Sequence, residues 1–185
     1  MPDVADFHTH NPYAAPGTAI INVPREALLH PETFCPAEGG LYSAGIHPWW
    51  TVEADDVVLM LKNLPLLLSR PEVVAVGECG FDALRGASLE EQERAFKAQV
   101  AMAEQRQLPV TLHVVRAYDR LLRMVKQLRP TTQWTVHGFR GKPQLARQLL
   151  SVGVDLSFGK RYNAESYALC PPHRRHRETD DDYLK

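Results

Sequence analysis

The chain has 185 residues, of which 44% are hydrophobic and 23% charged, so its composition excludes a disordered protein. Its length predicts one domain spanning residues 1–185. The net charge of −1 conceals an asymmetry, because residues 1–105 carry 6 basic and 15 acidic side chains whereas residues 106–185 carry 15 and 7. The basic half suits a polyanionic partner, although such charges are also typical of solvated helix faces.

No segment of the sequence predicts export or membrane insertion. The longest apolar run, residues 57–68, contains Lys62 and a proline and is far shorter than a membrane span, so we interpret it as a core helix. The N-terminus lacks a basic region followed by an apolar run, the pattern of a secretion signal. The three cysteines form no C-x-x-C pair, and we expect all of them to be free in a reducing cytoplasm.

Short β-rich runs alternate with helical patterns, which predicts βαβ units and a parallel sheet. The predicted strands are residues 4–10, 19–23, 41–48, 73–80, 109–115, 134–139 and 154–159, with an eighth near residues 177–180. The predicted helices are residues 57–68, 87–107, 117–130 and 142–153. Ser88 and Glu91 form a capping box at the second helix, and Pro143 and Gly153 mark the ends of the last.

The predicted fold is an α/β (β/α)8 TIM barrel in a compact version that lacks some outer helices near its first and last strands. Only about ten residues separate the first two strands, and the chain stops five residues after Asp180. Residues 173–177 are all arginine or histidine, which is unusual for a buried strand. Either this last strand is short and edge-like, or it lies outside the barrel and Asp180 does not reach the site.

Polar residues recur at the C-terminal ends of the predicted strands, where barrels of this kind place their active sites. His8 and His10 are two residues apart on the first strand, so both face the barrel interior. The other residues placed in this way are Glu78, His113, His137 and Asp180. A structural role would explain any one of these histidines, but the whole set favours a nitrogen and oxygen ligand set for zinc, manganese or a mixed dinuclear centre.

The sequence resembles the TatD family of metal-dependent deoxyribonucleases over nearly its whole length, through "FHTH", "GIHPWW", "GECGFD", "LPVTLH", "HGFRG", "LSFG" and "ETD". The resemblance implies hydrolysis of phosphodiester bonds, with DNA as the substrate and exonuclease action as one form of it. It implies two divalent ions (Zn, Mn, Mg or Ni) held by His8, His10, Glu78, His113, His137 and Asp180. Glu78 would bridge the ions, and Asp180 would orient the activated water and accept its proton.

Three further residues are candidates for phosphate binding. His47 also ends a strand but lies outside the family's ligand set, so a structural role is an equal alternative. Arg116 and Arg140 follow the strands of His113 and His137 and could grip phosphate, or else form salt bridges at the rim. Arg116 lies one residue later than in the family pattern H-x-R-x-A, a shift that would turn a strand side chain to the opposite face.

Other interpretations stay open at this point. Trp49 and Trp50 follow His47 after one proline, and one of them could stack on a base while the other packs the barrel rim. His173 and His176 are expected at the surface. The protein could instead hydrolyse a small ester, lactone or phosphoester, since fold and ligands do not determine substrate. The unusual "HRRHRETDDD" end also allows a metal-binding barrel with little catalysis, and the oligomeric state is left open.

Overall fold

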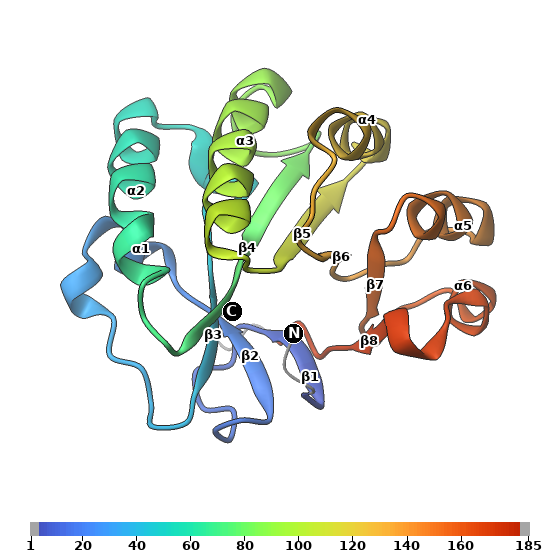
Figure 1. The fold of residues 1–185 in the computed structure, drawn as a ribbon, viewed down its shortest axis with the longest axis horizontal. Coiled ribbons are helices and arrows are strands. Elements are labelled where there is room, and N and C mark those ends of the chain that lie inside the picture. The colour runs from blue at the N-terminus through green and yellow to red at the C-terminus, as the bar shows by residue number, and fades with distance from the viewer. Residues whose placement is uncertain (1–3, 182–185) are drawn as a thin grey trace.

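The computed structural model describes residues 4–181, in which eight parallel strands follow one another in chain order around a ring (Figure 1). The strands are β1 (Asp6–Thr9), β2 (Ala19–Asn22), β3 (Leu41–Ala44), β4 (Val73–Asp82), β5 (Val110–Val115), β6 (Trp134–Val136), β7 (Asp155–Phe158) and β8 (Arg175–Arg177). Every pair of consecutive strands is parallel. The predicted TIM barrel is therefore confirmed.

Helices surround the strands except near β1, because the described chain has no helix between β1 and β2 and none after β8, as predicted (Figure 1). They are α1 (Arg25–Leu29), α2 (Ala54–Leu67), α3 (Leu89–Arg106), α4 (Tyr118–Leu128), α5 (Pro143–Ser151) and α6 (Ala164–Leu169), with 3-10 turns η1 (Pro31–Thr33), η2 (Pro48–Thr51) and η3 (Pro172–Arg174). The sequence did not predict α1 and α6, because helices of 5 and 6 residues are too short to show an apolar period.

The sequence explains how α3 forms and what it covers. The Ser88 hydroxyl accepts the Glu91 N–H at 3.3 Å while the Glu91 carboxylate accepts the Ser88 N–H at 3.1 Å, which completes the predicted capping box. Phe96 and Val100 lie buried on the inner stripe of the helix, and the Phe96 ring packs edge-on against Trp134 of β6. This face of α3 therefore ties the helix layer to the barrel wall.

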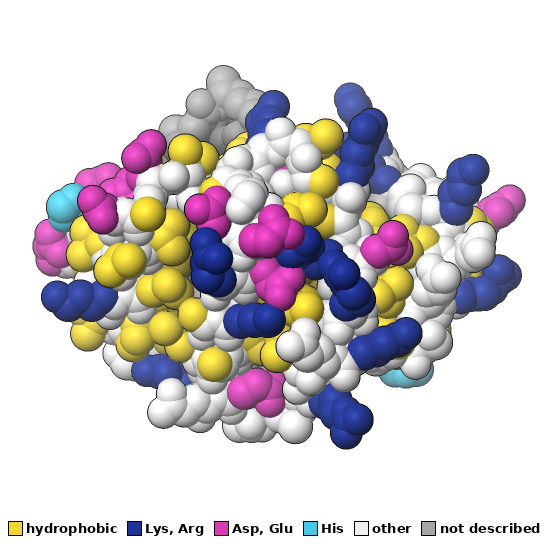
Figure 2. Space-filling view, turned by 90° about the horizontal axis from the view of Figure 1, so that it is seen from above, with side chains coloured by type: hydrophobic (Ala, Val, Ile, Leu, Met, Phe, Trp, Pro, Cys, Tyr) yellow, Lys and Arg dark blue, Asp and Glu magenta, His cyan; other side chains and the backbone are white. Residues whose placement is uncertain are grey.

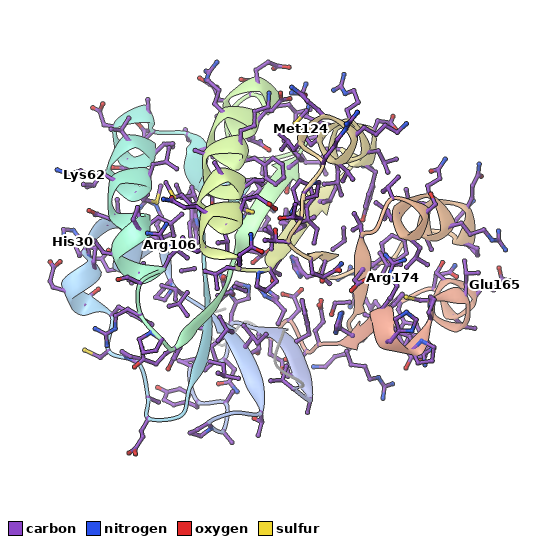
Figure 3. The ribbon with its side chains drawn as sticks, in the orientation of Figure 1. His30, Lys62, Arg106, Met124, Glu165 and Arg174 are labelled. Atoms are coloured by element: carbon purple, nitrogen blue, oxygen red, sulfur yellow. The ribbon has the colours of Figure 1, made fainter. Side chains whose placement is uncertain are left out.

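Charged and apolar side chains are unevenly spread over the outside of the helix layer. Lys62 and Glu165 point away from the barrel in Figure 3, and both are exposed. Figure 2 shows hydrophobic side chains grouped on the α1 and α2 side, where Val58 and Leu66 are exposed, whereas basic side chains are frequent on the opposite side. None of the described helices is both long and apolar enough to cross a bilayer.

The last strand differs from its predicted position. It covers residues 175–177 rather than 177–180, and it pairs with β7 through three residues. Its basic side chains find partners: His176 stacks on Phe7 with ring centroids 4.5 Å apart, and Arg175 covers the Tyr167 ring at 4.2 Å. The strand is therefore short, as one alternative held, and the idea that this segment lies outside the barrel is wrong.

The ring closes through the residues that follow β8 rather than through a ladder between β8 and β1. The Thr179 N–H donates to Asp6 Oδ1 at 2.9 Å and the Thr179 hydroxyl donates to Asp6 Oδ2 at 2.6 Å. The Asp180 N–H then donates to the His8 carbonyl at 3.1 Å, and the His10 N–H donates to the Asp181 carbonyl at 3.1 Å. This seam holds Asp180 against β1, beside His8 of that strand and His10 directly after it.

Asp6→Ala should loosen the seam, because it removes the acceptor of both Thr179 donors. We expect the free energy of unfolding to fall by about 1–3 kcal/mol, the cost of unpairing partly buried donors that a carboxylate had satisfied. Urea denaturation measures this change, with the exposed Glu38→Ala as the control at unchanged stability. Equal stability of both variants would show that the Asp6 contacts do not hold the ring closed.

Candidate metal centre

The Glu78 carboxylate lies at the centre of the barrel mouth and is buried, with 2% of the residue exposed. One of its oxygens, Oε2, faces β1: the Nε2 atoms of His8 and His10 both lie 3.3 Å from it. Asp180 stands beyond them, its Oδ1 3.8 Å from each of the same two nitrogens. His10 directly follows β1 rather than ending it, and Asp180 follows β8 rather than ending it, but both predicted residues meet His8 and Glu78 in one place.

The other oxygen, Oε1, faces histidines from the following strands. His137 Nε2 lies 2.6 Å away, His113 Nδ1 lies 2.9 Å away and His47 Nε2 lies 3.3 Å away. His47 comes after the end of β3, and its ring centroid is 4.4 Å from that of His113. His47, which the sequence placed outside the ligand set, is therefore as close to Glu78 as the histidines of β1.

Several buried polar atoms at this centre lack a hydrogen bond. Among the described residues neither ring nitrogen of His8 has a hydrogen-bond partner, and neither does Glu78 Oε2. Donor atoms lie within 4.8 Å of one another in each of three groups, which are His8, His10 and Glu78; His8, His137 and Asp180; and His47, Glu78 and His113. Such clustered, unpaired nitrogen and oxygen donors fit a divalent metal ion.

Two carboxylates outside this cluster orient its imidazoles. Asp82 Oδ2 lies 3.2 Å from His113 Nε2, and a proton on Nε2 donated to this carboxylate would leave the Nδ1 lone pair available to a metal ion beside Glu78. Glu178 Oε1 accepts the Gly138 N–H at 2.6 Å and lies 3.4 Å from His137 Nδ1. Neither acid was predicted as a site residue, although Asp82 ends the motif "GECGFD" and Glu178 begins the motif "ETD".

The charges at this centre hold one another ionised. Burial would raise the pKa of Glu78, but the positive charge of His137 and His8 lowers it well below the usual value. Burial would lower the pKa of His137, but the charge of Glu78 and a hydrogen bond that His137 donates to Glu178 raise it well above the usual value. The pKa of His47 is lowered because burial outweighs its attraction to Glu78. The protein without metal therefore compensates the Glu78 charge with protons on imidazole.

Two adjoining cavities open over the centre. One has a volume of about 250 Å³ and is lined by His10, His47, Trp49, Trp50, Glu78, His113, His137 and Asp180. The other, of about 690 Å³, shares three of these residues and extends to Arg116, Tyr118 and Arg140. Arg116 lies beyond the end of β5 with a φ of 50°, so strand alternation does not set its direction, and it lines the same cavity as Arg140.

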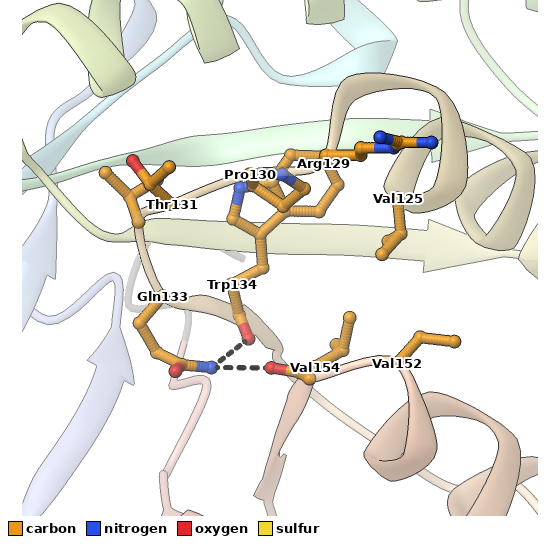
Figure 4. Close-up of a pocket in the computed structure, with 10 residues that line it drawn as sticks. Val125, Arg129, Pro130, Thr131, Gln133, Trp134, Val152 and Val154 are labelled. Carbon is orange, nitrogen blue, oxygen red and sulfur yellow. Dashed lines mark hydrogen bonds between the residues drawn. The ribbon is translucent and has the colours of Figure 1, made fainter.

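A third cavity, of about 310 Å³, lies at the opposite end of the barrel (Figure 4). It is lined by residues that precede or begin β6 and β7, among them Arg129, Gln133 and Trp134. The Gln133 amide donates to the Trp134 and Gly153 carbonyls at 3.0 Å and so links the two segments. Neither His173 nor His176 belongs to the centre: His173 is exposed, as predicted, whereas His176 is half-buried between Phe7 and Asp155 rather than at the surface.

The fold and the donor cluster together define a TIM barrel with a histidine and carboxylate centre at the C-terminal ends of its strands. Residues 33–185 match the model of a family described as TatD related DNase, and the chain belongs to this family. The structure resembles that of YJJV, a TatD homolog from Escherichia coli K12, with a TM-score of 0.74 and 23% identity over 96% of this chain and 78% of that one. At this identity the likeness shows the fold.

Sequence relatives carry the name 3'-5' ssDNA/RNA exonuclease TatD. The protein of Klebsiella pneumoniae is 32% identical over 157 residues, which are 77% of this chain and 57% of the relative. The protein of Pectobacterium carotovorum is 35% identical over 152 residues, which are 77% of this chain and 58% of the relative. The chain therefore spans less than two thirds of the length of these curated relatives.

Close approach of two glycines positions Glu78. A Cβ on Gly45 would lie 2.7 Å from Gly77 Cα, so the end of β3 packs directly on the backbone before Glu78. The Glu78 N–H in turn donates to the Asn22 side-chain oxygen at 2.9 Å.

Gly45→Ala should push β3 away from β4, because backbone atoms cannot give way as a flexible side chain can. We expect a loss of about 1–3 kcal/mol in the free energy of unfolding, as for overpacking elsewhere in protein cores. Thermal and urea denaturation measure it. Gly159→Ala is the matched control, since its added Cβ would meet its nearest neighbour at 3.7 Å. A Gly45→Ala protein as stable as the control would contradict the close-packing argument.

Proposed function

We propose that the protein is a divalent-metal-dependent hydrolase of phosphodiester bonds in nucleic acid, with DNA as its substrate. One observation carries the proposal: a buried carboxylate, Glu78, presents its two oxygens to two separate sets of imidazoles. This is the arrangement in which one carboxylate bridges two ions, and the names of the sequence relatives agree with it.

The chain's own residues divide between the two proposed ions. His8, His10 and Asp180 would share one ion with Glu78 Oε2, whereas His113 and His137 would share the other with Glu78 Oε1. His113 Nδ1 and Glu78 Oε1 stand 2.9 Å apart, so a hydrogen bond joins them when Nδ1 is protonated, and both atoms could contact one ion when it is not. Nitrogen and oxygen donors of this kind suit zinc, manganese or nickel, and magnesium less well.

Asp180 is the proposed general base. Its side chain is 35% exposed at the edge of the centre, so it can reach both solvent and the donors of β1. There it would orient the attacking water and accept its proton, while Glu78 and the histidines hold their places. Bound metal ions would supply Lewis acidity, which activates water and offsets the charge that develops on the phosphate.

The two cavities would take the substrate. His47 would contact the scissile phosphate beside Glu78, and Arg116 and Arg140 would bind a phosphate further along the strand in the larger cavity. The relatives' name supports exonuclease action on single strands, which we include in the proposal. The three free cysteines fit a reducing cytoplasm, and we propose that residues 1–185 act there as one domain.

The decisive experiment combines metal analysis with two substrates. The purified protein should contain or take up divalent ions, and it should cleave single-stranded DNA and bis(p-nitrophenyl) phosphate. Asp180→Asn should lower kcat by about 10²–10⁴-fold, since general base catalysis contributes that much. Asp181→Asn is the control, because the Asp181 carboxylate lies 2.9 Å from Lys160 Nζ and does not face the donor cluster. Metal binding without cleavage of either substrate would reject the nuclease proposal and favour a small-ester hydrolase or a metal-binding barrel.

Arg140→Ala tests the path of the strand. Removing one phosphate contact should raise the KM for an oligonucleotide while leaving kcat on bis(p-nitrophenyl) phosphate near that of the wild type. The slope of log affinity against log salt should become shallower by about 0.7, the value for one phosphate contact on a single strand. Arg147→Ala on the outer face of α5 is the control. An unchanged slope would remove Arg140 from the substrate path.

A further inference from the structure

The indole of Trp49 is hydrogen-bonded to Asp82, the carboxylate that contacts His113 of the proposed metal centre. Trp49 belongs to η2, which begins directly after His47. It is 42% exposed in the wall of the smaller cavity. Its Nε1–H donates to Asp82 Oδ2 at 2.6 Å. The same oxygen lies 3.2 Å from His113 Nε2, and His113 Nδ1 faces Glu78. A continuous line of contacts therefore runs from the cavity wall to the centre.

The other contacts of Asp82 leave its Oδ2 to these two donors. Its Oδ1 accepts the backbone N–H groups of Leu84 at 2.8 Å and Arg85 at 3.2 Å. Its own N–H donates to the Gln92 side-chain oxygen at 2.8 Å, and the residue is buried. The orientation of the carboxylate is thus shared between a fixed loop and the indole. Of these partners, Trp49 is the one that a substrate in the cavity would touch.

We propose that Trp49 is a positioning residue: through its N–H on Asp82 it sets the orientation of the His113 imidazole and so couples the cavity wall to the metal centre. The physical reason is that two N–H donors on one oxygen constrain each other. Without the indole donor the carboxylate keeps its contacts to the loop but loses the one that fixes Oδ2, and the direction of His113 is less constrained. The inference rests on the proposed metal centre, but it does not depend on the identity of the substrate.

An alternative role for Trp49 is a stacking surface for a base, with no effect on the centre. Arg85 already lies over the indole, its guanidinium carbon 4.5 Å from the ring centroid. Trp49→Phe keeps an aromatic ring in the wall and removes the N–H, so it separates the two roles. Asp82→Asn keeps the volume of the intermediate residue and removes its charge. Trp50→Phe is the matched control, because no hydrogen bond of the Trp50 indole is found within residues 4–181.

Cobalt(II) added to the metal-free protein reports on the centre without substrate, since its visible absorption depends on ligand geometry. Trp49→Phe should weaken cobalt binding by about 10-fold and alter the visible spectrum, in the range known for lost partners of ligating histidines. The double variant with Asp82→Asn should bind cobalt within about twofold of Asp82→Asn alone, because Trp49 acts through Asp82. Trp50→Phe should match the wild type.

Hydrolysis of bis(p-nitrophenyl) phosphate, which carries no nucleobase, adds a kinetic readout. Trp49→Phe should lower kcat on this substrate, whereas a pure stacking role would leave it unchanged and raise KM for oligonucleotides only. Wild-type cobalt affinity and spectrum in Trp49→Phe or in Asp82→Asn would overturn the inference and leave the proposed function standing. Absence of cobalt binding by the wild-type protein would overturn both.

Discussion

The burial of one negative charge shapes the whole mouth of this barrel. Glu78 sits where almost no water reaches it, and a carboxylate in that position is tolerated only when positive charge surrounds it. The chain supplies that charge from imidazoles on β1, after β3, on β5 and after β6. Protons on histidine can compensate Glu78, and so can a divalent cation, which makes the same geometry suitable for binding metal.

A second set of carboxylates, outside the donor cluster, orients the imidazoles within it. Asp82 and Glu178 each contact the outward nitrogen of an imidazole whose inner nitrogen faces Glu78. Such contacts favour a proton on the outer nitrogen, so that the inner nitrogen can offer its lone pair once a metal ion replaces the inner proton. These two carboxylates lie in the loops and strand ends at the C-terminal face of the barrel, where sequence can vary without disturbing the packed apolar layers beneath.

The sequence predicted the barrel and the residues that meet at its mouth because both follow from simple periodicities. Alternation along a strand puts His8 and His10 on one side, and parallel strands bring Glu78, His113 and His137 to the same end. Long amphipathic helices such as α3 are predictable from their capping residues and from the spacing of their apolar side chains. The strand β8 was placed too late in the sequence, because the five arginines and histidines of residues 173–177 do not look like a buried strand, yet two of them find aromatic partners in the fold.

Other features could not be read from the chain. Arg116 lies just after β5 and has a left-handed backbone, so the alternation of side chains along a strand does not determine where it points. The roles of Asp82 and Glu178 depend on which ring nitrogen of each histidine points outward, and packing decides this rather than spacing. His47 comes close to Glu78 only because β3 ends before it and η2 begins after it.

The seam between β1 and the residues after β8 has a thermodynamic consequence. Donors from the two sides of the seam, His8 and Asp180, contribute to the same cluster. An ion held by both would bind only the closed ring, so its binding free energy would add to the free energy that keeps the ring shut. The metal would then stabilise ring closure as well as serve as a cofactor, and detachment of the residues after β8 from β1 would be linked to release of the ion.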